Sequence, residues 1–290
     1  MIPTSPSPVI TVVIPTFNRA ASVGSAIESV LGQAVSSVEV IVVDDGSTDN
    51  TLSSVRQLSD DRVRVEAIAH SGRGKARNRG VELASAPWVT FLDSDDRAKE
   101  GWLSCLVAGL STGSMLASCG AHFLYEDGTT KDVLPRPQGP AFGMVEAQFL
   151  AGTFAVHKEI FQSVGGYLPG LEFGENTELG MRLGTKIASL GGRFTADERT
   201  LLDVQATHRE YDAVRLYQSG MLTLGQPGNL LAKDSALHAS YLAITGVAAS
   251  RMGRGHDARR LLRQAWAVQP TNWRHPMRVL RTWAPVSSWR

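Results

Sequence analysis

Short apolar runs rich in β-branched residues recur along the first hundred residues, and each reads as a buried strand. Segments with the spacing of amphipathic helices separate them. Strand–helix alternation with apolar strands predicts an α/β fold, with a mostly parallel central sheet flanked by helices on both faces. The expected strands are 9–14, 38–43, 63–68 and 88–92, and the expected helices are 20–34, 51–58, 72–84 and 102–110.

Polar clusters follow the strands of this predicted sheet. Asp93, Asp95 and Asp96 come directly after the last strand, and Asp44 and Asp45 follow the second. A single acidic strand end is equally well explained as a solvated turn. Because ligands of parallel sheets bind beyond the carboxyl ends of the strands, several such clusters on one rim predict a binding site. Clustered carboxylates need solvent or a shared cation, and Mg²⁺ or Mn²⁺ prefers such oxygens.

Two common nucleotide-binding motifs are absent from the sequence. A G-x-G-x-x-G loop would indicate a dinucleotide site, and G-x-x-x-x-G-K-[ST] would indicate a P-loop. Gly72 and Gly74 lack the third glycine at the required spacing, and Lys75 is followed by Ala76 instead of Ser or Thr. Carboxylates for a metal, with Arg and Asn for phosphate or base, suit a nucleoside-diphosphate ligand instead.

After residue 110 the pattern changes to a hairpin and a mixture of strands and helices. The expected elements are strands at 118–125, 131–134, 154–157 and 194–204, helices at 158–164 and 175–190, and a loop at 135–143. The residues beyond His208 read as all-helical.

The composition suits a globular chain of one large or two modest domains, since 43% of its 290 residues are hydrophobic and 20% are charged. No apolar run approaches the ~20 residues of a membrane-spanning helix, and we expect residues 1–8 to be a disordered lead-in instead of a secretory signal. Cys105 and Cys119 lack metal-type spacing. We therefore expect reduced thiols in a cytoplasmic protein.

The C-terminal segment carries most of the positive charge. Residues 251–290 contain nine Arg and one Asp, a net charge of +8, which leaves −7 for the first 250 residues because the whole chain carries +1. Residues 241–270 resemble one tetratricopeptide repeat, with two helices, small residues at their crossing and a closing proline. A single repeat leaves a face uncovered, so this segment should pack against the rest of the chain or a partner.

Beyond that repeat, Trp273, Trp283 and Trp289 alternate with arginines. Trp and Arg on an amphipathic segment suit an anionic membrane surface, which predicts peripheral contact at the inner face of the membrane. A solvated helix packed on the body of the protein is the alternative. We do not expect a nucleic-acid partner, because the body is acidic.

Four motifs, in order along the chain, resemble those of the family 2 glycosyltransferases. They are VIPTFNR at 13–19, VVDDGSTD at 42–49, GKARNRG at 74–80 and FLDSDD at 91–96. A weaker resemblance continues through GGY at 165–167 and GENTEL at 174–179 to about His208. The resemblance implies the A-type glycosyltransferase fold and an inverting transfer of sugar from a nucleoside-diphosphate sugar to an acceptor. The acceptor class stays open between a saccharide, a lipid-linked compound, a peptide and a small molecule.

The resemblance implies a nucleotide-binding role for nine positions. Among them Asp45 would bind the base, and Asp93 would face the ribose or the sugar. The full set is Pro15, Thr16, Asn18, Arg19, Asp44, Asp45, Arg77, Asn78 and Asp93.

The resemblance also implies a metal that bridges the diphosphate. Asp95 would ligate Mg²⁺ or Mn²⁺, with Asp93 and Asp96 in support. His208 lies where some members place a downstream metal- or phosphate-contacting histidine, although a lone histidine is more often structural. The ion would neutralise the charge that develops on the departing diphosphate.

Inversion requires a base that takes the proton of the acceptor hydroxyl. The family usually has Glu-Asp at the start of a helix here, with the Asp as base, but this chain has Glu175-Asn176. Asn is not a base at neutral pH. Glu175 is therefore one candidate, Glu178 one helical turn later is another, and lost or altered activity is the third. Glu175 also fits a carboxylate that only favours the helix dipole.

We expect four regions, with a nucleotide-sugar-binding half at 9–110, an acceptor-binding and catalytic half at 111–212 and a helical extension at 213–290, after the lead-in at 1–8. A nucleotidyltransferase on a related fold would need a Gly-rich loop after the first strand, which the sequence lacks. A non-catalytic or degenerate nucleotide-sugar-binding scaffold is the other alternative, and Asn176 keeps it open.

Overall fold

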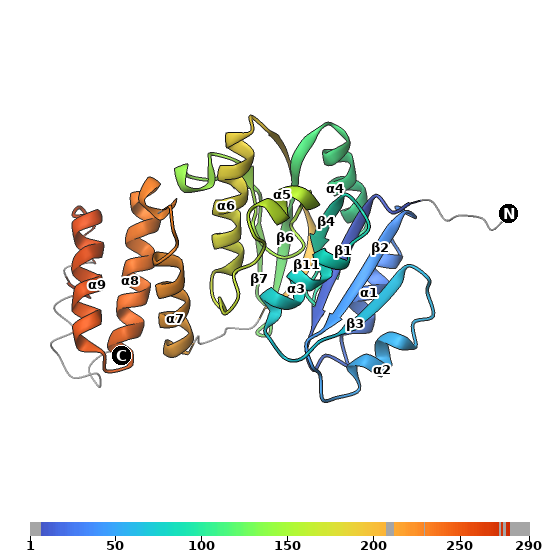
Figure 1. Ribbon diagram of the computed structural model, residues 1–290, viewed down its shortest axis with the longest axis horizontal. Coiled ribbons are helices and arrows are strands. Elements are labelled where there is room, and N and C mark those ends of the chain that lie inside the picture. The colour runs from blue at the N-terminus through green and yellow to red at the C-terminus, as the bar shows by residue number, and fades with distance from the viewer. Residues whose placement is uncertain (1–6, 207–211, 229, 273, 275–276, 279–290) are drawn as a thin grey trace.

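The computed structural model describes residues 7–206, 212–228, 230–272, 274 and 277–278. A central sheet lies between helices on both faces, and three further helices stand beyond α6 at the end away from β2 and β3 (Figure 1). This arrangement confirms the predicted α/β fold with a helical C-terminal region.

The first half of the sheet is parallel. Its strands are β1 (Ile10–Thr16), β2 (Val38–Asp44), β3 (Val63–Ala67) and β4 (Trp88–Phe91), in the order β3-β2-β1-β4. Thr16 at the end of β1 pairs with Asp44 at the end of β2. The polar clusters that follow these strands therefore meet on one rim, as the sequence predicts.

The second half of the sheet is mixed. β10 (Phe154–His157) runs antiparallel to both β4 and β6 (Ser114–Tyr125), and β11 (Arg193–Ala206) runs parallel to β6. The edge strands β5 (Arg97–Ala98) and β7 (Thr130–Val133) are antiparallel to β11 and β6. The expectation of a mostly parallel sheet thus holds for the first half, since the hairpin and the short β10 insert reversed strands into the second.

The region predicted as a loop at 135–143 contains some regular structure. β8 (Arg136–Pro137) pairs with β9 (Glu146–Ala147), and the 3₁₀ helix η1 (Pro140–Phe142) lies between them. Both strands have only two residues, which is too short for an apolar period to show in the sequence.

Each face of the sheet packs against its own layer of helices, because successive strand residues point to opposite faces. Val12 belongs to the core under α1 (Val23–Leu31) and α4 (Trp102–Ser111), whereas Val13 belongs to the opposite core. The other helices of the α/β part are α2 (Thr51–Arg56), α3 (Arg73–Leu83), α5 (Lys158–Ser163) and α6 (Glu175–Ser189). Trp102 is fully buried and donates its Nε1–H to the Gly152 carbonyl at 2.6 Å, so it is a core residue.

The C-terminal region consists of α7 (Ala213–Leu224), the 3₁₀ helix η2 (Leu230–Lys233), α8 (Ser235–Arg251) and α9 (Gly255–Val268). The three α-helices share a core of their own. Leu231 and Tyr241 instead belong to the core of the α/β part, so the helices pack on the body as the single-repeat argument predicts. Among the helices of the described residues, none is long and apolar enough to span a membrane.

Gly80, the last residue of the 74–80 motif, lets α3 approach β1 closely. A Cβ at this position would lie 2.3 Å from Val13 Cγ1. Gly80→Ala should therefore lower the free energy of unfolding by about 1–3 kcal/mol, because overpacking outweighs the ~0.5–1 kcal/mol gain in helix propensity. Urea denaturation measures the change. Gly24→Ala in α1, where a Cβ meets nothing within 4 Å, is the control and should be neutral or stabilising. Equal effects of the two changes would contradict the close approach.

Candidate active site

A cavity of about 750 Å³ opens where β1, β2 and β4 end. Both acidic and basic side chains face it, which suits a ligand with a metal-bound diphosphate. Its lining consists of Pro15, Thr16, Phe17, Arg19, Asp45, His70, Gly72, Arg73, Asp93, Ser94, Asp95, Glu172, Asp212 and Arg215.

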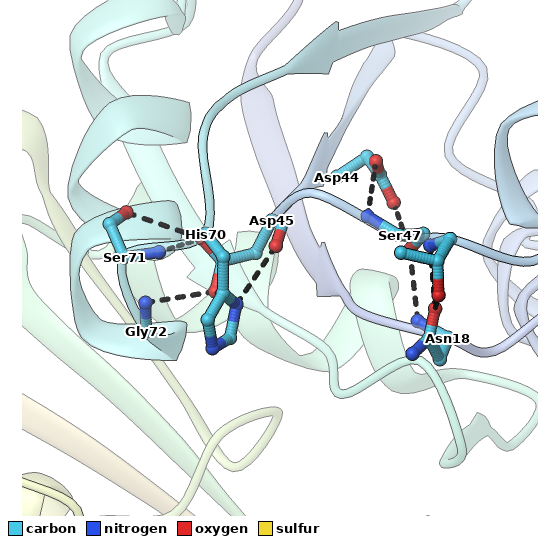
Figure 2. Close-up of polar contacts among 8 residues, drawn as sticks. Asn18, Asp44, Asp45, Ser47, His70, Ser71 and Gly72 are labelled. Atoms are coloured by element: carbon cyan, nitrogen blue, oxygen red, sulfur yellow. Dashed lines mark hydrogen bonds and ion pairs between the residues drawn. The ribbon is translucent and has the colours of Figure 1, made fainter.

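The loops after β1 and β2 are joined by side chains of the predicted motifs (Figure 2). Asp44 accepts hydrogen bonds from the Ser47 backbone N–H at 3.1 Å and from the Ser47 hydroxyl. Asn18, in the left-handed region with φ 52°, donates its N–H to Ser47 Oγ at 2.9 Å and accepts from the Thr48 N–H at 2.8 Å. The contacts of Asp44 and Asn18 thus fix the shape of these loops, and neither residue lines the cavity.

Asp45 ties the loop after β2 to the start of α3 (Figure 2). Its Oδ1 accepts from the Ser71 N–H at 2.7 Å, and its Oδ2 accepts from the Gly72 N–H at 2.8 Å. His70 Nδ1 lies 3.0 Å from the same Oδ2. Asp45 is 3% exposed, so a nucleotide base could contact only the part of the carboxylate that these donors leave accessible.

His70 and Phe17 form a stacked pair at this end of the cavity, with ring centroids 4.3 Å apart. Sequence reasoning missed both residues as site residues. Phe17 lies inside the first motif, which is a signal that could have identified it, whereas His70 lies outside the 74–80 motif and carries no local signal. The pair offers a flat, partly exposed aromatic surface beside Asp45.

Arg77 lies beneath the acidic rim and is fully buried. It donates from NH2 to Asp93 Oδ1 at 2.6 Å, and its guanidinium lies 5.0 Å from the ring centroid of Tyr167. Burial disfavours the charged form, but the neighbouring anionic groups, Asp93 first, outweigh it, so the pKa of Arg77 is raised above its ordinary value. Arg77 thus holds Asp93 from below, and its own side chain does not line the cavity.

The three rim carboxylates differ in exposure. Asp93 and Asp95 line the cavity, and Asp95 Oδ2 lies 3.3 Å from Arg19 NH2. Asp96 is only 5% exposed and accepts the Gln205 N–H at 3.0 Å. Burial, together with the charges of Asp93 and Asp95, raises the pKa of Asp96 to about 9.

The rim has a donor set suited to a divalent cation. Within the described residues there is no group of three side chains that would hold an ion alone. Mg²⁺ and Mn²⁺ sites of this kind, however, take one or two carboxylates together with substrate phosphates, and Asp93 and Asp95 meet that need. A cation would also offset the repulsion among Asp93, Asp95 and Asp96, which contributes to the raised pKa of Asp96. His208 lies outside the described residues.

Glu175 begins α6 after Gly174, whose φ of 75° lies in the left-handed region. Its Oε1 is 2.9 Å from Arg73 Nε and 3.8 Å from Arg77 NH1. Glu175 is 6% exposed, and its partner Arg73 lines the cavity.

The other predicted catalytic candidates have structural partners. Asn176 accepts a hydrogen bond from the Tyr167 hydroxyl at 2.9 Å. Glu178, 2% exposed, forms a paired salt bridge with Arg182, whose Nε donates to Oε1 at 2.6 Å. Of the three candidates, Glu175 is the one that pairs with Arg73 of the cavity lining, although its own side chain is not part of that lining.

Asn78 also contacts Tyr167. Its Nδ2 donates to the Tyr167 carbonyl and its Oδ1 accepts the Tyr167 N–H, both at 2.8 Å. Burial raises the pKa of the Tyr167 hydroxyl, and its side chain is fully enclosed. Tyr167 thus packs against Arg77 within the core and does not line the cavity.

A family model described as "Glycosyl transferase family 2" matches residues 11–165. The chain therefore belongs to family 2 of the glycosyltransferases.

Curated relatives match about a third to under half of this chain. The Campylobacter jejuni GalNAc(5)-diNAcBac-PP-undecaprenol beta-1,3-glucosyltransferase is 37% identical over 110 residues, which cover 37% of this chain and 36% of the relative. The Rhizobium meliloti succinoglycan biosynthesis protein ExoO is 43% identical over 93 residues, which cover 32% and 27% of the two chains. With further curated relatives included, the match spans between 26% and 44% of the length of each relative.

Solved structures share the whole fold. Residues 1–349 of S. aureus TarS match with a TM-score of 0.64 at 16% identity, over 94% of this chain and 88% of that one. The mannosyltransferase PcManGT from Pyrobaculum calidifontis, solved with GDP-Man and Mn²⁺, matches with a TM-score of 0.58 at 20% identity, over 95% and 84%. At such identities the likeness shows the fold alone, and it confirms the predicted A-type glycosyltransferase fold.

Asp96 should make the metal-free protein less stable as pH rises. Its pKa is raised from 3.8 to about 9 in the folded state, so across that window the folded protein binds a proton that the unfolded chain has lost. Asp96→Asn keeps an oxygen for the Gln205 N–H and removes the acid. We expect it to be more stable than the parent near pH 8 by on the order of 1–3 kcal/mol, with a flatter pH profile.

Urea denaturation in EDTA, repeated across this pH range, measures both effects. Asp61→Asn, at an exposed position, is the control and should follow the parent profile. An Asp96→Asn profile identical to the parent's would contradict the protonated state of Asp96.

Proposed function

We propose that this protein is an inverting glycosyltransferase that moves a sugar from a nucleoside-diphosphate sugar to an acceptor with the help of a divalent metal. The observation that carries the proposal is the rim itself. Asp93 and Asp95 face a cavity at the strand ends of a family 2 chain, and Arg19 and Arg73 line the same cavity. Carboxylates for a metal and guanidinium groups for phosphates are what a metal-bound diphosphate requires.

The nine predicted nucleotide positions divide into two groups. Five of them line the cavity and are proposed to contact the donor: Pro15, Thr16, Arg19, Asp45 and Asp93. The other four, Asn18, Asp44, Arg77 and Asn78, are proposed to act by holding the loops and Asp93 in place. Two neighbours of similar fold were solved with UDP-GlcNAc and with GDP-Man, which supports a nucleotide-sugar donor without choosing its base.

The metal would be held by Asp95 and Asp93, and when bound it would supply positive charge for the departing diphosphate. PcManGT, solved with Mn²⁺, supports this assignment. Asp96 is proposed to accompany them only as a buried neighbour, because its carboxyl points to the Gln205 N–H of β11.

Glu175 is the proposed base. In a direct displacement the acceptor oxygen forms a bond to the anomeric carbon, the bond to the diphosphate breaks, and the acceptor proton passes to the Glu175 carboxylate. Arg73 holds that carboxylate at 2.9 Å and also lines the cavity. Substrate phosphates that attract Arg73 would release a lone pair of Glu175 for the proton.

A non-catalytic nucleotide-sugar-binding protein is the second candidate. Asn176 occupies the position of the expected base, and its side chain is engaged by the Tyr167 hydroxyl. This alternative retains the donor site and lacks turnover. Measurements of binding and of hydrolysis on the parent protein and on two variants therefore separate the catalytic from the non-catalytic candidate.

Glu175→Gln and Asp95→Ala should affect different steps, turnover in the first case and nucleotide binding in the second. Glu175→Gln removes the proton acceptor and should lower the kcat of donor hydrolysis by roughly 10²–10⁴-fold, while the Kd for the nucleoside diphosphate stays within about twofold. Asp95→Ala removes a metal ligand and should abolish the Mn²⁺-dependent part of nucleotide binding. Calorimetry with UDP and GDP, in Mn²⁺ and in EDTA, measures binding. Release of UDP or GDP from UDP-GlcNAc, UDP-glucose and GDP-mannose measures turnover.

Glu82→Gln, a change on the exposed side of α3, is the control for both variants. Full activity of Glu175→Gln would exclude it as the base. Nucleotide binding with no hydrolysis by the parent protein would favour the non-catalytic alternative. Unchanged binding by Asp95→Ala would exclude the metal assignment.

We also propose that the basic C-terminal segment contacts an anionic membrane surface, as an acceptor carried on a lipid would require. Arg263 and Trp266 are exposed on α9, and they extend the Arg and Trp pattern of residues 271–290 into the described part of the chain. Such side chains combine attraction to anionic lipid with an affinity for the interface.

Removal of residues 271–290 should reduce co-sedimentation with vesicles that contain phosphatidylserine. The four arginines lost contribute about 1 kcal/mol each near such a surface at low salt. Vesicles of phosphatidylcholine alone, and added salt that screens the charge, are the controls. Equal sedimentation of the full and shortened proteins would reject the membrane contact.

A further inference from the structure

The loop that leads into Glu175 is held by α7. Ser219 on this helix is 1% exposed, and its hydroxyl oxygen accepts the backbone N–H groups of Glu172 and Phe173, each at 3.1 Å. This single hydroxyl therefore holds two consecutive peptide groups of the loop.

The next helix, α8, contacts the same loop at Gly174. A Cβ on Gly174 would lie 2.8 Å from the Tyr241 hydroxyl. The φ of 75° at this residue also favours glycine, which adopts positive φ without a steric penalty. The Tyr241 hydroxyl also interacts with Thr177 in the first turn of α6. Tyr241 thus lies against the residues on both sides of Glu175.

α7 and α8 pack closely on each other. Gly220, next to Ser219, packs so closely on α8 that a Cβ would lie 2.0 Å from Thr245 Oγ1. The Thr245 hydroxyl in turn donates to the Tyr241 carbonyl at 2.7 Å. Figure 1 shows α7 and α8 beside α6, on the side away from the sheet. The two contacts on the loop therefore come from a single packed helix pair.

The opposite side of the loop faces the cavity. Arg73 donates from NH2 to the Glu172 carbonyl, and its Nε lies 2.9 Å from Glu175. Arg215, on the first turn of α7, lines the cavity and pairs with the Glu172 carboxylate at 3.2 Å. The loop is held between the helix pair and the arginine that contacts the proposed base.

We infer that the C-terminal helices form part of the active site, with Ser219 and Tyr241 as positioning residues for Glu175. This inference rests on the proposed role of Glu175. α7 and α8 hold the backbone from Glu172 to Gly174, and that backbone determines the position of the Glu175 side chain. Displacement of a reacting group by a fraction of an ångström lowers the turnover of a bound substrate without weakening its binding.

Ser219→Ala tests the inference, with Thr223→Ala as its matched control. Thr223 is one turn further along α7 and is similarly buried, and its hydroxyl donates to the Ser219 carbonyl of its own helix. Ser219→Ala should speed hydrogen exchange of the Glu172 and Phe173 amides by roughly tenfold. It should also lower the kcat of donor hydrolysis by roughly tenfold, with the KM for the donor unchanged. Thr223→Ala should leave the exchange and kcat at the parent values.

Tyr241→Phe is the milder second variant, since it keeps the ring in the core and removes only the hydroxyl. It should lower kcat at constant KM and speed exchange in the first turn of α6. Parent-like exchange and kcat in Ser219→Ala, or an equal loss of kcat in Thr223→Ala, would overturn the inference. Absence of hydrolysis by the parent protein would overturn the proposed function and the positioning role with it, while the exchange data would still decide whether α7 holds the loop.

Discussion

The Arg77 side chain is fully buried, and a buried charge is tolerated only where nearby groups compensate for it. Asp93 supplies the close ion pair at 2.6 Å, and Glu175 lies 3.8 Å from the other terminal nitrogen. Arg77 itself lies on α3, whereas Asp93 follows the end of β4 and Glu175 begins α6. The position of one guanidinium therefore couples the proposed donor side of the site to its proposed base.

Tyr167 closes the other side of this guanidinium and is itself fixed by two motif residues. Asn78 binds its backbone, and Asn176 accepts its hydroxyl. Motif residues of this chain thus divide between those that face the cavity and those that hold such residues in place. The Asn at 176 is understandable in these terms, because an amide oxygen accepts from a tyrosine hydroxyl without adding a further negative charge beside Glu175.

The carboxylates of the rim also repel one another. Three carboxylates within four residues repel one another, and the most buried of them, Asp96, holds its proton well above the usual range. Asp93 pairs with Arg77 and Asp95 lies close to Arg19, and both carboxylates line the cavity. A cation bound as proposed would offset this repulsion, and the proposed metal and donor binding would then be coupled to the stability of the fold.

The sequence by itself determined the strands of the parallel half, the rim on which their polar ends meet, and the family, because burial leaves a periodic apolar pattern and motifs are local. Tertiary structure decided what those motif residues do. The stacking of Phe17 on His70, the contact of Arg73 with Glu175 and the bonds of Ser219 to the loop join residues far apart in the chain. No local pattern encodes such pairs, since each side chain is ordinary in its own segment. The helical C-terminal region was predictable as helix, but only its packing shows that it holds the loop before Glu175.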